Sequence, residues 1–152
     1  MNNNHMQQAL AQAQLAFAQD EVPIGAVVVR ENNIITQAFN SCETDRNPLS
    51  HAEIKAIQEA TKKTGNWRLT DCDLYVTLEP CPMCLGALFQ ARIRTLYIGC
   101  YDHKRLDNNL SIFPSLKGKT QITDNNHTIK VVGGIMETEC SELLKDFFKK
   151  KR

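Results

Sequence analysis

The chain has 152 residues, enough for one compact domain, because single domains most often contain about 100–150 residues. Hydrophobic residues make up 42% of it, with only 7 glycines and 5 prolines, and no heptad pattern persists, so a disordered chain, a collagen and a coiled coil are excluded. The formal net charge is +1, which on its own argues against a nucleic acid as partner.

The N-terminal part of the chain predicts a helix, two strands and a second helix. A helix is expected from about Met6 to Asp20, ended by Pro23, with an apolar stripe of Leu10, Ala13, Phe17 and Ala18. The β-branched run Ile24–Val29 is typical of a strand covered on both faces. A second strand is expected at Ile34–Phe39, and a second helix from Ser50 to about Lys63.

The C-terminal part predicts three more strands and two more helices. The strands are expected at Leu74–Leu78, Thr95–Ile98 and Ile129–Val132. One helix begins near Pro82, because proline suits the first turn of a helix. The last helix, about Glu137 to Lys149, is expected to place five residues on its packed side: Cys140, Leu143, Leu144, Phe147 and Phe148.

Strands that alternate with helices predict a central sheet with helices on both faces. We therefore expect an α/β fold of three layers, α/β/α, around a five-stranded sheet. The polar segment 101–127 shows no pattern that assigns it a structure. With no repeat or linker to divide the chain, a single domain is expected over residues 1–152.

Positive charge is concentrated towards the C-terminus. Residues 1–88 carry 6 Lys and Arg against 10 Asp and Glu, whereas residues 89–152 carry 12 against 7. The chain ends in Lys149, Lys150, Lys151 and Arg152. Such a tail can contact a polyanion locally, or it can simply be a solvated helix end whose cations complement the helix dipole. Charge alone favours the second interpretation.

The N-terminal residues and the cysteines indicate in which cellular compartment the protein works. Residues 1–5 lack the basic and apolar regions of a signal peptide, and no apolar stretch approaches the roughly 20 residues of a membrane span. We therefore expect a cytoplasmic protein with reduced cysteines and no membrane association. Cys42, Cys72, Cys100 and Cys140 stand alone and are expected to be buried thiols that act as small hydrophobic residues.

Cys81 and Cys84 form a C-x-x-C pair at the expected start of a helix. Taken alone, the pair fits a zinc site, a redox dithiol or coincidence. His51 favours zinc, because one histidine and two cysteines supply three ligands of the types that zinc prefers. A catalytic zinc site has three protein ligands and leaves the fourth position for water.

Glu53 has two interpretations. Ser50 and Glu53 match the capping box S-x-x-E, in which the glutamate only stabilises the helix start. Alternatively, Glu53 acts at the same site as His51. Residues two apart point to different sides of a helix body, so the two side chains can converge only at the helix tip, where Ser50 places them.

His51–Glu53 followed by Pro80–Cys84 matches the H-x-E…P-C-x-x-C signature of the zinc deaminases. The match extends to Asn40 and to the segments Glu21–Val27, Leu74–Cys81 and Glu139–Phe148. Over about residues 6–152 the chain resembles the bacterial tRNA-specific adenosine deaminases.

This resemblance implies a cytidine deaminase-like fold with a mixed five-stranded sheet, a homodimer, and hydrolysis of the wobble adenosine of a tRNA anticodon to inosine. By position, one Zn²⁺ per subunit is held by three residues: His51, Cys81 and Cys84. Zinc-bound hydroxide attacks the base, and Glu53 transfers the protons. Asn40 contacts the flipped nucleotide, and Asp102 lines the anticodon side. If the substrate is RNA, the basic C-terminus, residues 149–152, is the candidate for contacts with its phosphates.

The chain departs from the family after Lys104, where a small glycine-containing loop is usual and this sequence reads Arg105 to Leu110. Two other functions fit the residues. One is a deaminase of a free guanine, cytosine or nucleoside, against which the basic tail argues because a neutral base needs no phosphate contacts. The other is a structural zinc module, which requires a fourth ligand such as Cys42 or Cys72.

Overall fold

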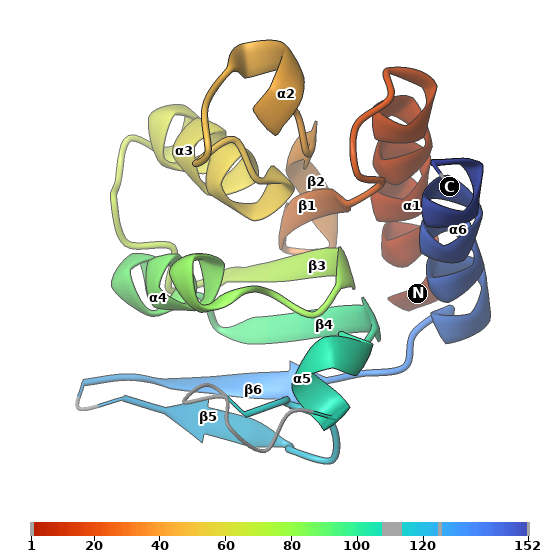
Figure 1. Ribbon diagram of the computed structural model, residues 1–152. Coiled ribbons are helices and arrows are strands. Elements are labelled where there is room, and N and C mark those ends of the chain that lie inside the picture. The colour runs from red at the N-terminus through yellow and green to blue at the C-terminus, as the bar shows by residue number, and fades with distance from the viewer. Residues whose placement is uncertain (1, 108–113, 125, 152) are drawn as a thin grey trace.

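The computed structural model describes residues 2–107, 114–124 and 126–151. The described helices are α1 (Asn2–Ala18), α2 (Cys42–Asp45), α3 (Ala52–Thr64), α4 (Pro82–Ala91), α5 (His103–Asp107) and α6 (Glu137–Lys150). The strands are β1 (Gly25–Arg30), β2 (Asn33–Phe39), β3 (Cys72–Leu78), β4 (Thr95–Cys100), β5 (Gln121–Thr123) and β6 (Thr128–Val132). One sheet lies between α1 and α6 on one face and α3 and α4 on the other (Figure 1).

The strands lie in the order β2-β1-β3-β4-β6-β5. β3 pairs in parallel with β4, and β4 with β6, whereas the pairings β1–β2, β1–β3 and β5–β6 are antiparallel. The mixed α/β/α sandwich is thus confirmed, but the prediction of five strands is wrong, because β5 adds a sixth. It has only three residues, with the outer two exposed, so neither length nor an apolar pattern marks it in the sequence.

Parallel pairing of β3 with β4 determines where the site forms. Leu78 pairs with Cys100 at the ends of these strands, so the chain leaves both strands at the same edge of the sheet. The segment after β3 leads into α4, and the segment after β4 leads into α5. Ligands bind at this carboxyl edge in open α/β sheets.

The central strand β1 is buried on both faces, as its β-branched sequence predicts. α1 lies so close to β1 that a Cβ atom added to Gly25 would be only 1.9 Å from the carbonyl oxygen of Ala9. The fully buried stripe of α1 is accordingly made of Met6 and small residues: Ala9, Ala13 and Ala16. The predicted stripe is therefore partly wrong, since Ala18 is exposed.

α1 and α6 lie side by side, and the C-terminal end of α6 lies next to the C-terminal end of α1 (Figure 1). Phe17 and Phe147 form an edge-on ring contact at 5.8 Å, and Nζ of Lys151 is 2.6 Å from a carboxylate oxygen of Asp20. Phe148, predicted to be packed, is 48% exposed. Within the described part of the chain, no helix is long and apolar enough to cross a bilayer.

Candidate active site

Two helix N-termini meet at the carboxyl edge of β3. His51 is the N-cap residue of α3, and Cys81 is the N-cap residue of α4. Neither side chain caps its own helix. Pro82 occupies the first turn of α4, where its missing N–H costs no hydrogen bond. Cys84 follows one turn of chain later and points to the same side as Cys81.

The three predicted ligand residues come together here. Nδ1 of His51 is 3.6 Å from Sγ of Cys81 and 3.4 Å from Sγ of Cys84, and all three atoms lie within 4.8 Å of one another. Tetrahedral zinc, with bonds of about 2.0 Å to nitrogen and 2.3 Å to sulfur, places these atoms roughly 3.5 Å apart. The donor types and spacing therefore fit a zinc ion.

Among the described residues, this cluster contains only those three potential ligands. The thiol of Cys42 donates to Oδ1 of Asn40 (3.2 Å), and the thiol of Cys72 donates to the carboxylate of Asp71 (3.5 Å). Neither cysteine therefore closes the site. Three ligands with an open fourth position are typical of catalytic zinc.

The two cysteine thiols interact directly. A hydrogen bond from Cys84 is the largest influence on Cys81, whose pKa falls to about 5. The same hydrogen bond raises the pKa of Cys84. Cys81 also accepts hydrogen bonds from the backbone N–H groups at the start of α4, where the helix dipole favours negative charge. The thiolate form that binds metal is thus stabilised at Cys81.

Glu53 does not form the capping box that its spacing from Ser50 allows. Since α3 begins at Ala52 with His51 as its N-cap, Glu53 is the second residue of the helix and not the third. Its side chain is buried beside the cysteines, and burial is the main reason that its pKa rises to about 7. A carboxyl group with such a pKa can both accept and release a proton near neutral pH.

A pocket of about 230 Å³ lies beside His51 of this cluster. Its lining includes His51, Glu53 and Asn40, so three predicted site residues share one cavity. Nδ2 of Asn40 donates to the carbonyl of Val22 (3.2 Å), while its Oδ1 accepts from Cys42. The volume is below the roughly 300–1,000 Å³ typical of pockets for drug-sized ligands, which favours a ligand as small as one base.

The segment that carries Asn40 is held by residues that the sequence analysis missed. Nζ of Lys55 donates to the carbonyl of Phe39 (2.9 Å) and to Oγ of Ser41 (2.6 Å), on either side of Asn40. The buried carboxylate of Glu21 accepts hydrogen bonds from Thr44 and from the backbone of Glu43. Although burial opposes it, these bonds lower the pKa of Glu21. No sequence pattern marks Lys55.

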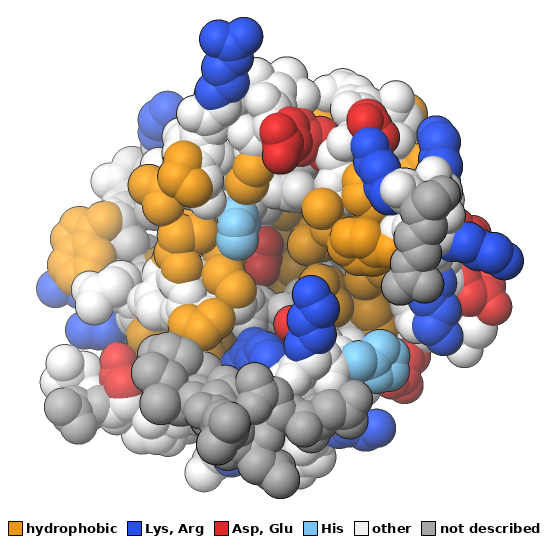
Figure 2. Space-filling model, viewed as in Figure 1, with side chains coloured by type: hydrophobic (Ala, Val, Ile, Leu, Met, Phe, Trp, Pro, Cys, Tyr) orange, Lys and Arg blue, Asp and Glu red, His pale blue; other side chains and the backbone are white. Residues whose placement is uncertain are grey.

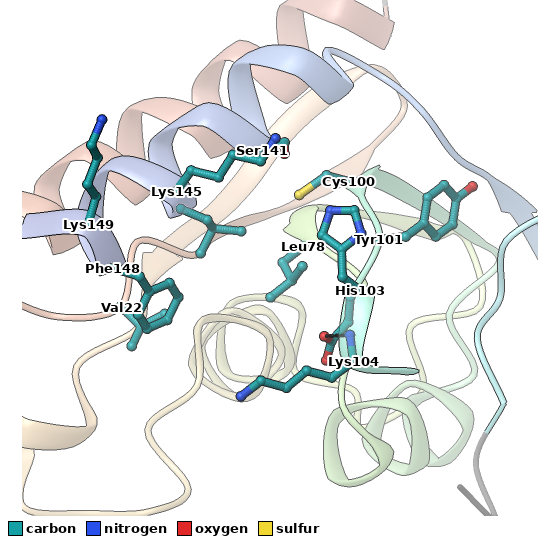
Figure 3. Close-up of a pocket in the computed structure, with 12 residues that line it drawn as sticks. Val22, Leu78, Cys100, Tyr101, His103, Lys104, Ser141, Lys145, Phe148 and Lys149 are labelled. Atoms are coloured by element: carbon teal, nitrogen blue, oxygen red, sulfur yellow. Dashed lines mark hydrogen bonds between the residues drawn. The ribbon is translucent and has the colours of Figure 1, made fainter. Parts of the chain in front are cut away.

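A larger pocket of about 560 Å³ adjoins the first, since Val22 lines both. Asp102 lines this second pocket, where its Oδ1 accepts a hydrogen bond from the backbone N–H of Lys104. Side chains of α6 form the opposite wall (Figure 3). The face of the molecule shown in Figure 2 has a hollow at its centre. An acidic side chain lies beside a histidine in this hollow, and Lys and Arg side chains lie around it.

The C-terminal cations do not all lie together. Lys149, with Lys145, lines the larger pocket (Figure 3). Nζ of Lys150 lies 5.4 Å above the ring of Phe17, and Lys151 lies above Phe147 while it pairs with Asp20. Arg152 is outside the described residues.

The chain is similar to known deaminases. The family model of the MafB19-like deaminases matches residues 1–152. The tRNA-specific adenosine deaminase of Bacillus subtilis is 40% identical over 148 residues, which cover 97% of this chain and 89% of that protein.

Solved structures give the same result. One from a study of A-to-I editing by tRNA:A34 deaminases at the wobble position of transfer RNA superposes with a TM-score of 0.80 at 37% identity, covering 93% of this chain and 99% of that one. A guanine deaminase from Nitrosomonas europaea has a TM-score of 0.79 at 22% identity, covering 97% of this chain and 84% of that one, and shares the fold.

Proposed function

This chain belongs to the tRNA-specific adenosine deaminases, and from that premise we propose that it hydrolyses adenosine to inosine at the wobble position of a tRNA anticodon, releasing ammonia. The observation that carries the proposal is one small pocket lined by His51, Glu53 and Asn40, with the Sγ atoms of Cys81 and Cys84 at 3.6 and 3.4 Å from Nδ1 of His51.

We propose that His51, Cys81 and Cys84 hold one Zn²⁺. Bound zinc lowers the pKa of water and so supplies a nucleophile at neutral pH. Glu53 lies two residues from His51 at the same helix tip. Its carboxylate accepts one proton from the attacking water and delivers it to the ring nitrogen. It then takes the remaining proton from the new hydroxyl group on the attacked carbon and delivers it to the amine, which leaves as ammonia. Glu53 therefore need not bind the metal.

Asn40 orients the base. Its amide already donates one hydrogen bond to Val22 and accepts one from Cys42, and an amide has a second N–H and a second lone pair. These remaining groups are available to the edge of a base in the small pocket. An anticodon loop is already single-stranded, which lowers the cost of turning the base out of its stack.

The larger pocket has the chemistry of a single-stranded RNA site. Phe148 offers an exposed ring for stacking, and Lys145 and Lys149 stand beside it at the pocket wall (Figure 3). Aromatic rings and cations in one groove are the usual combination for unpaired nucleotides. We therefore propose that nucleotides next to the wobble base enter here, past Asp102.

The double variant Lys145→Gln/Lys149→Gln tests this pocket. If both side chains contact phosphates, the slope of log affinity for tRNA against log salt should become shallower by about 0.7 per lost contact. The matched control, Lys150→Gln/Lys151→Gln, removes two cations that lie over aromatic rings next to α1. Equal loss of slope in both variants would mean that the tail of residues 149–152 acts as a whole, and no loss in either would leave it a solvated helix end.

Substrate choice distinguishes the proposed function from a free-base deaminase. We expect the zinc-loaded protein to form inosine in a tRNA with adenosine at the wobble position, and to leave free adenosine, guanine and cytosine unchanged at equal concentration. Ammonia release and nucleoside analysis by mass spectrometry measure both outcomes. Turnover of guanine or cytosine without turnover of tRNA would contradict the proposal.

From the family resemblance we also propose that the whole chain is one domain, that it works in the cytoplasm and that it forms a homodimer. Sedimentation equilibrium of the zinc-loaded protein with and without tRNA tests the last of these. A dimer mass is expected without tRNA, and the mass of a dimer plus bound tRNA with it; a monomer that stays active on tRNA would contradict the proposal.

A further inference from the structure

The segment after β4 forms a buried ion pair with the segment after β3. The side chain of Arg105, in the short helix α5, is only 10% exposed, and that of Glu79, just after β3, is fully buried. Nη1 of Arg105 lies 3.7 Å from Oε2 of Glu79. A buried charge is stable only when it is paired and hydrogen-bonded, so this arrangement indicates a specific structural demand.

The guanidinium of Arg105 connects two segments of the backbone. Its Nη1 donates to the carbonyl of Pro80 (2.5 Å), and its Nη2 donates to the carbonyl of Pro114 (3.0 Å). Only arginine presents two parallel donors in a fixed plane, so lysine cannot replace it geometrically. Arg105 thus attaches α5 both to the segment before Cys81 and to the segment that leads to β5.

The carboxylate of Glu79 completes the connection. Oε1 accepts hydrogen bonds from the backbone N–H of Asp102 (3.0 Å) and from Oγ of Ser115 (3.2 Å), and Oε2 accepts one from the backbone N–H of Leu116 (2.6 Å). Together, Glu79 and Arg105 join three segments that are far apart in sequence: residues 79–80, 102–105 and 114–116.

These three segments connect the metal-ligand candidates to the larger pocket. Pro80 directly precedes Cys81, one of the three clustered metal-ligand candidates. Asp102 lines the larger pocket, as does Lys104 (Figure 3). The ion pair therefore fixes the position of one wall of the larger pocket relative to the metal-binding end of α4.

We propose that Arg105 is a positioning residue for RNA binding: paired with Glu79, it holds Asp102 and Lys104 at a fixed place beside the metal site. This inference rests on the proposed function, because it assumes that the larger pocket receives RNA. When this wall is already ordered in the free protein, less of the binding free energy is lost in ordering it. Loss of Arg105 should therefore weaken tRNA binding and leave the chemical step nearly intact.

Steady-state kinetics on tRNA test the proposal. Arg105→Gln should raise KM about tenfold, which corresponds to a loss of about 1.4 kcal/mol in binding free energy. It should change kcat by less than about threefold, the pattern of a contact made equally before and during reaction. Zinc should remain near one per chain. Arg105→Lys keeps the charge but not the two parallel donors, and should show an intermediate KM.

The matched control is Arg94→Gln. Arg94 also makes a two-donor pair with a carboxylate, that of Asp73, at 3.0 Å for each bond. That pair joins the first residues of β3 and the turn before β4, at the opposite edge of the sheet. KM and kcat for tRNA should not change. If Arg94→Gln raises KM as much as Arg105→Gln, the effect is general destabilisation and the proposal is wrong.

Amide hydrogen exchange of the zinc-loaded protein gives a readout that does not depend on activity. Peptides that cover residues 101–105 and 79–84 should exchange faster in Arg105→Gln than in the parent protein, because the amide of Asp102 bonds to Glu79. If exchange in Arg105→Gln is unchanged, Arg105 does not hold the segment after β4 in place. If exchange is faster but KM is unchanged, Arg105 holds this segment but has no role in RNA binding. If the parent protein is inactive on tRNA, only the proposed function is contradicted. The exchange measurement still decides whether Arg105 holds the segment in place. Should Arg105→Gln fail to fold, Arg105→Lys answers the same questions.

Discussion

Glu53→Gln is expected to abolish deamination while the protein keeps about one zinc per chain. Glutamine has the same shape but cannot accept or release the proton that a carboxyl group with a pKa of about 7 can exchange. General acid–base catalysis is worth typically 10²–10⁴-fold. Because one group serves several transfers here, the loss should lie at or beyond the upper end of that range.

Single-turnover formation of inosine, with zinc measured on the same sample, checks this result. Glu59→Gln is the matched control, since Glu59 lies on the same helix but is exposed and pairs with Lys62 at the surface. It should retain full activity. Substantial activity in a folded, zinc-loaded Glu53→Gln would remove Glu53 from the reaction, and loss of zinc would instead make it a ligand.

Cys84→Ala should lose zinc, stability and activity together. The two remaining ligands, His51 and Cys81, cannot hold the ion tightly, and a metal that binds only the folded chain contributes its binding free energy to folding. If free zinc exceeds its Kd a thousandfold, the loss of stability is on the order of 4 kcal/mol. Metal analysis and thermal unfolding with and without added zinc measure this difference.

Cys140→Ala and Cys72→Ala are the controls for this experiment. Both thiols are buried away from the cluster, so each variant should keep its zinc and most of its activity, with unfolding changed only by lost packing. Loss of zinc from Cys72→Ala, or from Cys42→Ala, would point to a closed site of four protein ligands and hence to a structural metal.

The candidate metal centre follows from local sequence patterns because each part lies at a helix start. Pro82 predicts where α4 begins, which places Cys81 and Cys84 together at its tip. The start of α3 was predicted less well, since Ser50 has the residue type of a cap but His51 occupies that position. Because α3 begins one residue later than predicted, Glu53 cannot form the capping box, and it lines the small pocket instead.

Other features depend on long-range contacts that no local pattern records. α1 packs through alanines because Gly25 allows it to approach β1 closely, and alanines contribute little to an apolar stripe. Phe148 lies at helical spacing with buried neighbours, yet α6 ends beside a pocket and not against the sheet. Arg105 reads as an ordinary surface cation, since its partners Pro80 and Pro114 are distant in sequence.

The most direct test of the central claim is to incubate a tRNA that has adenosine at the wobble position with the zinc-loaded protein in ¹⁸O-labelled water, using Glu53→Gln as the blank, and to locate and weigh the product by mass spectrometry. Hydrolysis by the proposed site predicts inosine at the first anticodon position, with the label on the carbon that carried the amino group, and none in the blank. Absence of inosine, inosine at other adenosines, or equal inosine in the blank would contradict the account.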